Sequence, residues 1–191
     1  RPLADGIIKA LLSVRYLFRS KSMDLLKYAA KSMSMTDEVW NRHSNPWSVY
    51  TRFTVLPIMS VCFWSRDWIG LYFIVPVLLS FIWVWLNPRL FKPPSKTDNW
   101  ASMGTFGERI YLNRQNECIP KHHINACRTL QILSAIGLPL FLYGVYALDF
   151  WVLLLGNLWI MVFKAWFVDR MVWLYLDMKN TNAIYAAWYR T

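Results

Sequence analysis

The sequence predicts an all-α polytopic membrane protein, with four transmembrane helices arranged as two hairpins and an amphipathic helical arm at the N-terminus. Of its 191 residues, 56% are hydrophobic and only 17% are charged, whereas a soluble domain carries about 25% charged residues. The apolar residues gather into four runs that approach the roughly 20 residues a helix needs to cross a bilayer. Lys and Arg flank these runs, which is typical of segments that end among lipid headgroups.

Residues 1–38 form the predicted arm. Ile7, Leu11, Val14 and Phe18 recur at helical spacing between basic residues, which indicates a helix lying on a membrane surface or against a partner. We interpret it as a retained arm because acidic residues interrupt the basic pattern. The alternative, the remnant of a targeting peptide, stays open because such peptides are also basic and amphipathic.

Residues 39–178 form the predicted membrane domain, and residues 179–191 form a tail whose end we expect to be frayed. The spans are expected at about 46–64, 68–86, 126–147 and 150–172. Asn45 and Pro46 suit the cap and first position of the first helix. We expect Asp67 to cap the second helix and Pro88 to end it.

The longest polar stretch, residues 87–125, separates the two predicted hairpins. It is too short for a separate soluble domain. Within it, residues 108–112 read as one or two helical turns at the membrane interface. We therefore expect a loop that lies against the ends of the spans.

Four spans would place both termini on the same side of the membrane. Residues 1–52, 87–128 and those after 163 hold 20 of the 21 Lys and Arg residues, and Arg66 is the remaining one. The positive-inside rule assigns this basic side to the cytoplasm, matrix or stroma. We expect the inner mitochondrial membrane with both termini in the matrix, and a bacterial inner membrane or a plastid membrane remain alternatives.

The net charge of +10 admits either nucleic acid or anionic lipid as a partner. The basic residues flank apolar runs and form no dense tract. We therefore expect anionic phospholipid and no nucleic acid. No cofactor is expected, except a bound phospholipid such as cardiolipin.

No catalytic motif is found in the sequence, which lacks GxSxG, GxGxxG and P-loop patterns. The three cysteines include no CxxC pair, so a disulfide framework or zinc ribbon is not indicated. His122 and His123 are adjacent, so they would point in different directions on a helix, and no HExxH spacing is present. We predict neither catalytic residues nor a metal site.

Five segments, taken together, resemble a known family: residues 40–52, 85–91, 97–102, 107–112 and 166–173. The family consists of small, largely bacterial membrane proteins of unknown function. The resemblance covers about residues 39–178 and leaves the arm outside. It implies four spans and brings no assigned reaction.

Polar residues of these segments should meet at the basic side, and two interpretations of them stay open. One is an internal polar network of His43, Asn45, Asp98, Asn99, Glu108 and Asp169. The other is a site for anionic lipid headgroups, with the donors Arg52, Arg89, Arg109 and Arg170.

The predicted function is that of a non-catalytic accessory or structural subunit of a larger membrane complex, such as a respiratory-chain or ATP synthase assembly. Its partners would be other membrane subunits, because the spans are rich in aromatic residues and the basic arm can reach neighbouring subunits or cardiolipin. Two alternatives are a small transporter or lipid-modifying enzyme with a polar site on the basic side, and a pigment- or quinone-binding subunit.

Overall fold

The computed structural model describes residues 33–191. The chain divides into two compact units, Arg1–Thr36 and Asp37–Thr191. The predicted amphipathic arm therefore lies almost wholly outside the described residues. The fold described below is that of the second unit.

The second unit is built from helices, and residues 37–191 contain no strand. This confirms the predicted all-α class. In chain order the elements are α2 (Asp37–His43), α3 (Pro46–Phe53), α4 (Val55–Trp64), α5 (Arg66–Ile69), the 3₁₀ helix η1 (Gly70–Phe73), α6 (Ile74–Leu90), α7 (Trp100–Leu112), α8 (Lys121–Ala147), α9 (Phe150–Met178) and α10 (Ala183–Ala187).

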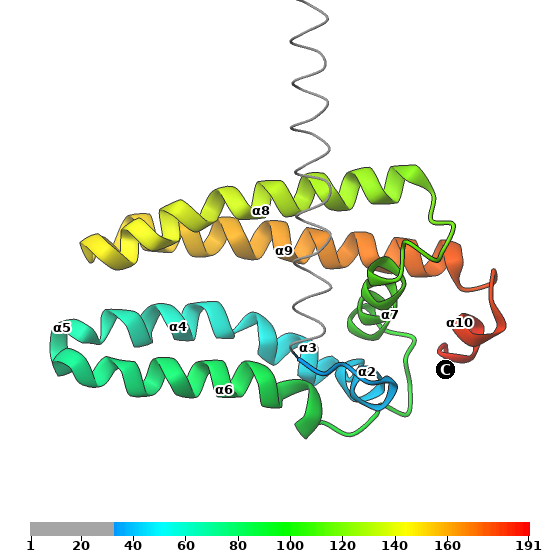
Figure 1. Cartoon of the computed structure of the whole chain (residues 1–191), viewed down its shortest axis with the longest axis horizontal. Coiled ribbons are helices and arrows are strands. Elements are labelled where there is room, and N and C mark those ends of the chain that lie inside the picture. Colours follow the sequence, from blue (N-terminus) through cyan, green and yellow to red (C-terminus); the bar gives the residue numbers. More distant parts are fainter. Residues whose placement is uncertain (1–32) are drawn as a thin grey trace, which may run out of the picture. The chain divides into compact units, whose positions relative to one another are not determined.

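Three helical stretches among the described residues are long and apolar enough to cross a membrane: Pro46–Leu90, Lys121–Ala147 and Phe150–Met178. They fit an integral membrane protein. The first stretch contains 45 residues and covers both of the first two predicted spans. It reverses direction at α5 and η1, so that α4 and α6 lie side by side (Figure 1).

The reversal depends on Gly70, whose backbone has φ +55° and ψ −137°, a region that is essentially open only to glycine. Asp67 lies inside α5, so its predicted capping role is wrong. The backbone keeps turning through Ser65, whose carbonyl accepts from the N–H of Trp68 at 2.9 Å. Pro88 also does not end its helix, because α6 continues through it to Leu90.

The long helices α8 and α9 form the second hairpin and pack along most of their length (Figure 1). Asp149 caps α9 by accepting from the N–H of Val152 at 3.1 Å, so α9 begins at the predicted residue. A Cβ on Gly144 would lie 2.5 Å from the Leu153 nitrogen. The glycine thus allows the close backbone approach that is common between membrane helices.

The two hairpins meet at their tips, the α5–η1 reversal and the α8–α9 turn. Arg66 donates to the carbonyl oxygens of Val145 and Tyr146 at 2.6 and 2.5 Å. Farther from the tips, the Ser60 hydroxyl of α4 and the Asn157 side chain of α9 are hydrogen bonded at 2.9–3.1 Å. These polar contacts join α4 and α5 of the first hairpin to the second hairpin, because a polar group in an apolar setting must find a partner within the protein.

Helix α7 is longer than the one or two turns predicted near residue 108. Asn99 caps it by accepting from the N–H of Ser102 at 2.9 Å. Ala101, Phe106 and Ile110 are buried, so α7 belongs to the packed interior of the unit. It packs against α9 at Gly107, where an added Cβ would lie 1.8 Å from the carbonyl oxygen of Met171.

We expect Gly107→Ala to destabilise the protein by about 3 kcal/mol, at the upper end of the cost of overpacking. The added methyl group meets the backbone of α9, which no side-chain rotation can relieve. Gly104→Ala is the matched control, one turn away on the same helix. Its methyl group meets a side-chain atom, Val168 Cγ1, at 2.6 Å, and we expect a cost of about 1 kcal/mol.

Thermal unfolding in detergent provides the measurement. Equal melting temperatures for the two variants would show that α7 does not cross α9 at this contact.

Candidate functional site at the basic end

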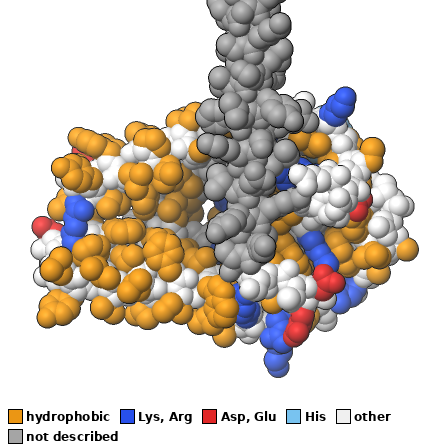
Figure 2. All heavy atoms as spheres, in the orientation of Figure 1, with side chains coloured by type: hydrophobic (Ala, Val, Ile, Leu, Met, Phe, Trp, Pro, Cys, Tyr) orange, Lys and Arg blue, Asp and Glu red, His pale blue; other side chains and the backbone are white. Residues whose placement is uncertain are grey.

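Charged side chains gather at one end of the second unit, which contains α2, α7 and α10. Apolar side chains cover the half formed by α4, α6 and α8 (Figure 2). We call the charged end the basic end. Arg66 is the only described Lys or Arg at the opposite hairpin tips.

A hydrogen-bonded chain centred on His43 organises the basic end. Arg52 Nη1 lies 3.1 Å from His43 Nε2, and His43 Nδ1 lies 2.8 Å from the Ser48 hydroxyl. Ser48 donates to Asn87 Oδ1 at 2.9 Å. Asn87 in turn donates to the Thr51 hydroxyl at 2.8 Å. The chain therefore joins α2, α3 and α6.

The direction of these hydrogen bonds fixes the tautomer of His43. A guanidinium group can only donate, so His43 Nε2 accepts and the ring proton lies on Nδ1. Burial of the ring, followed by the positive charges of Arg52 and Lys164, lowers the pKa of His43 from 6.5 to about 3. The ring is therefore neutral at neutral pH, as the hydrogen-bond pattern requires.

Asn45 and Asn99 hold the starts of two helices. Asn45 Oδ1 accepts from the N–H of Trp47 at 2.9 Å, which confirms the predicted cap of the first helix. Its amide nitrogen reaches the carbonyl oxygen of Lys92 at 2.9 Å. Ser102, one turn into the helix that Asn99 caps, donates to the carbonyl oxygen of Ser44 at 2.6 Å. Helix α7 is thereby attached to the α2–α3 junction.

The three acidic residues of the predicted network differ in their surroundings. Asp169 accepts from the indole nitrogens of Trp100 and Trp173, both at 3.3 Å. The negative charge of Glu108 attracts the positive guanidinium of Arg52. Asp98 is exposed and has no polar contact with another described residue. The structure thus brings Asp169 and Glu108 into the basic end and leaves Asp98 at its surface.

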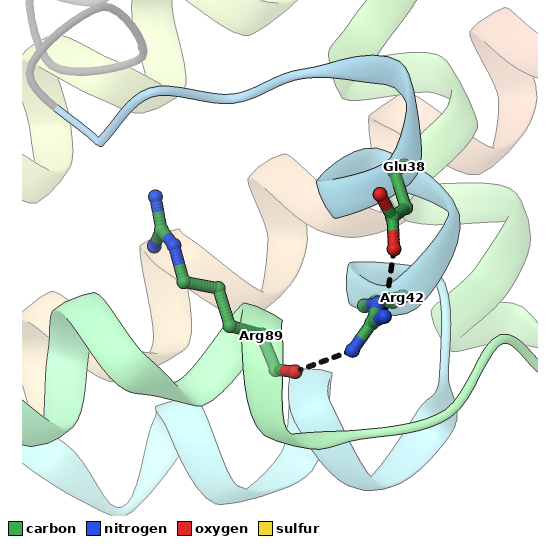
Figure 3. Close-up of polar contacts among 3 residues, drawn as sticks. All are labelled: Glu38, Arg42 and Arg89. Carbon is green, nitrogen blue, oxygen red and sulfur yellow. Dashed lines mark hydrogen bonds and ion pairs between the residues drawn. The ribbon is translucent and has the colours of Figure 1, made fainter.

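Arg89 belongs to a second group of contacts, shown in Figure 3. Its guanidinium lies over the Trp85 ring, 3.9 Å from the centroid. Its carbonyl oxygen accepts from Arg42 at 3.1 Å, and Arg42 is paired with Glu38 at 2.6 Å. The end of α6 is in this way tied to α2.

Arg109 lies beside a pocket, which we call the tail pocket. Arg109 pairs with Asp37, and its guanidinium lies 4.6 Å from the centroid of a Trp188 ring. The pocket has a volume of about 250 Å³ and includes Arg190 in its lining. The full lining is Asp37, Asn41, Phe106, Arg109, Ile184, Ala187, Trp188 and Arg190.

The four arginines predicted to bind headgroups thus have different neighbours. Arg52 is engaged with His43, and Arg89 lies on Trp85. Arg109 lines the tail pocket, whereas Arg170 is partly buried in α9. Arg109 alone among them lines this pocket.

The expected fraying of the tail is wrong. The Thr97 N–H donates to the carbonyl oxygen of Arg190 at 2.7 Å, and the Arg190 N–H donates to the Thr97 hydroxyl at 2.7 Å. Tyr185 donates to Glu117 at 2.6 Å. Burial, then the hydrogen bond to Glu117 and its charge, raises the pKa of Tyr185 to about 12. The tail is therefore packed against the loops that flank α7.

Residues 25–191 match a family described as a family of unknown function (DUF6653). The match confirms the suspected uncharacterised domain, and it begins within the arm that the resemblance had left outside. No curated protein and no solved structure matches the chain.

We expect acid to destabilise the protein through His43. The pKa of His43 is about 3 in the folded protein and 6.5 as its ordinary value, so between these values the unfolded chain binds the extra proton. The contribution of His43 to the free energy of unfolding is fully present above pH 6.5. It falls by up to about 1.4 kcal/mol per pH unit toward pH 3. Thermal unfolding in detergent with EDTA, from pH 7 to 4, measures this loss.

The variant His43→Asn removes the titrating ring and keeps an amide donor for Ser48. We expect it to melt at a lower temperature at pH 7 and to lose less stability in acid. The exposed His122 provides the control, since His122→Asn should keep the pH dependence of the unaltered chain. The same acid sensitivity in His43→Asn and in the unaltered chain would contradict this assignment.

Proposed function

The chain belongs to the family of unknown function DUF6653, and we propose that it is a non-catalytic structural subunit of a larger membrane protein complex that holds anionic lipid at its basic end. The polar residues of the basic end support a structural role, because their hydrogen bonds go to one another and to helix ends. His43, Asn45, Ser48 and Asn87 are all used in this way.

We propose four membrane crossings, with Pro46–Leu90 crossing twice. Its 45 residues would extend about 68 Å as one straight helix, roughly twice the hydrocarbon thickness. The reversal at Gly70 and the hydrogen bonds of Arg66 to the end of α8 support placing both tips at one membrane face. The basic end and the C-terminus would then lie together at the other face.

Two sets of exposed aromatic side chains support this topology. Trp68, Tyr72 and Trp151 lie at the hairpin tips and are 69%, 79% and 75% exposed. Trp47 and Trp173, near the basic end, are 67% and 52% exposed. On α9, Trp151 and Trp173 are about 33 Å apart along the axis, close to the spacing of the two aromatic belts of a membrane protein.

The observation that carries the subunit proposal is that few residues of the long helices are buried against the rest of the chain. In an apolar segment of 18 residues within Pro46–Leu90 only 11% of the residues are buried, and in the corresponding segments of α8 and α9 the share is 22% and 28%. The buried core between the hairpins centres on Phe141, Val145 and Leu153. Helices of neighbouring subunits would cover part of the apolar surface that remains.

The tail pocket supports the lipid part of the proposal. Two guanidinium groups, those of Arg109 and Arg190, line it together with one carboxylate, that of Asp37. Guanidinium groups bind phosphate oxygens through charge-assisted hydrogen bonds. We propose that this pocket takes the headgroup of an anionic phospholipid.

The membrane we propose is the inner mitochondrial membrane, with the basic end in the matrix. The support is the charge distribution of the sequence, because 20 of the 21 Lys and Arg residues fall on the proposed basic side. Cardiolipin would be the anionic phospholipid available there.

Gentle solubilisation tests the subunit proposal. We expect the tagged chain, extracted from its own membrane in mild detergent, to appear in native mass spectrometry within a discrete assembly of fixed stoichiometry. The 22.7 kDa chain should be a minor species. A tagged membrane protein of similar size from the same membrane is the control, and recovery of the chain as a free monomer would end the proposal.

The lipid proposal is tested by melting temperature in detergent, with cardiolipin or phosphatidylcholine added. We expect cardiolipin to raise the melting temperature more than phosphatidylcholine does, because a ligand of the folded state stabilises it. Arg190→Gln should remove most of this rise. Its backbone contacts with Thr97 do not depend on the side chain, so the fold should persist.

Lys96→Gln is the matched control, because it removes one positive charge at an exposed loop position outside the tail pocket. It should retain the effect of cardiolipin. An equal loss in both variants would indicate charge attraction without a site, and an unchanged response in Arg190→Gln would exclude the pocket.

A further inference from the structure

Two adjacent histidines and a carboxylate meet where α8 begins and α9 ends. One ligand atom each of His122, His123 and Asp177 lies within 4.8 Å of the others. The two imidazole rings are 4.2 Å apart between centroids. Their adjacency in the sequence predicted divergent side chains and no metal site, whereas the structure holds both rings beside the last turn of α9.

His123 is the buried member of this cluster, with 2% of its surface exposed. Its Nε2 atom lies 2.8 Å from Asp177 Oδ2. Its Nδ1 atom is buried and has no hydrogen-bond partner among the described residues. The contact with Asp177 is therefore made through Nε2, the ring atom of His123 that faces the other members of the cluster.

We propose that His122, His123 and Asp177 bind one divalent transition-metal ion, with Zn²⁺ as the representative. Two imidazole nitrogens and a carboxylate oxygen form a ligand set typical of zinc, and three protein ligands leave a fourth position for water. Ligation through Nε2 requires the neutral tautomer of His123 with its proton on Nδ1, so a proton held on Nε2 in the metal-free protein moves to Nδ1 when the metal binds.

The geometry requires only small movements. Ligand atoms around a tetrahedral zinc ion are about 3.4 Å apart when each lies about 2.1 Å from the metal. The contact between His123 and Asp177 has to lengthen from 2.8 Å, and the widest separation has to shorten from at most 4.8 Å. His122 and Asp177 are exposed, so their side chains can rotate toward the ion while His123 stays in place.

The third histidine of the chain offers a natural contrast. Both ring nitrogens of His43 are hydrogen bonded, to Arg52 and to Ser48, and the ring is buried. His43 therefore has no nitrogen to give to a metal. Saturable metal binding that needs imidazole is expected from His122 and His123 alone.

Isothermal titration with zinc chloride tests the site. The full chain is purified in detergent with an affinity tag that contains no histidine, and metals are removed with EDTA before titration. We expect one zinc ion per chain and a higher melting temperature in its presence. Magnesium should not compete, because it prefers oxygen ligands and keeps several waters.

His122→Gln and Asp177→Asn should each weaken zinc binding at least about tenfold and remove the zinc-dependent rise in melting temperature. Both residues are exposed, so the variants should fold. Lys121→Gln, exposed in the same turn of α8, is the control and should bind zinc as the unaltered chain does. Affinities that are unchanged in His122→Gln and Asp177→Asn, or the lack of a saturable site in the unaltered chain, would overturn the proposal.

Discussion

The basic end depends on one hydrogen bond, the donation from Arg52 to Nε2 of His43. Because the guanidinium cannot accept, this contact sets the direction of every bond that follows, through Ser48 to Asn87. Each member is polar and is held where water has little access, so the loss of one partner would leave another unsatisfied. The chain of bonds joins α2, α3 and α6, and the bond from Ser102 to Ser44 attaches α7 to the same structure.

The elements that could be predicted from the sequence are those with local causes. Asn45 with Pro46 begins a helix in the expected way, and α9 begins at the expected residue 150, because the capping atoms of Asn45 and Asp149 lie within three residues of their partners. The start of α7 has a cap of the same kind, Asn99 with the N–H of Ser102, whereas the length of this helix was underestimated. It packs on α9 residues 64 positions later, Gly104 on Val168 and Gly107 on Met171, so its length is a tertiary effect. Pro88 did not stop α6, which continues two residues beyond it to Leu90.

The site shows the same division between local and distant causes. The segments that resemble the family pointed to His43, Arg52 and Asn45. The hydrogen-bond partners of these residues could not be predicted from their spacing in the sequence. Ser48 and Thr51 are three residues apart on α3, so both can face Asn87 on α6. Asp177 lies 54 positions from His123, so no local pattern could connect them.

The tether at the hairpin tips has a consequence for how the protein is assembled. In the proposed four-crossing topology the first hairpin would enter the bilayer before the second has been made, and it would carry Arg66 across with it. The acceptors of that guanidinium, the carbonyl oxygens of Val145 and Tyr146, would be in place in this topology only after α8 had crossed as well. The hydrogen bonds of Arg66 would therefore form late in biogenesis. The first hairpin would lack these partners until the second hairpin had been synthesised and inserted.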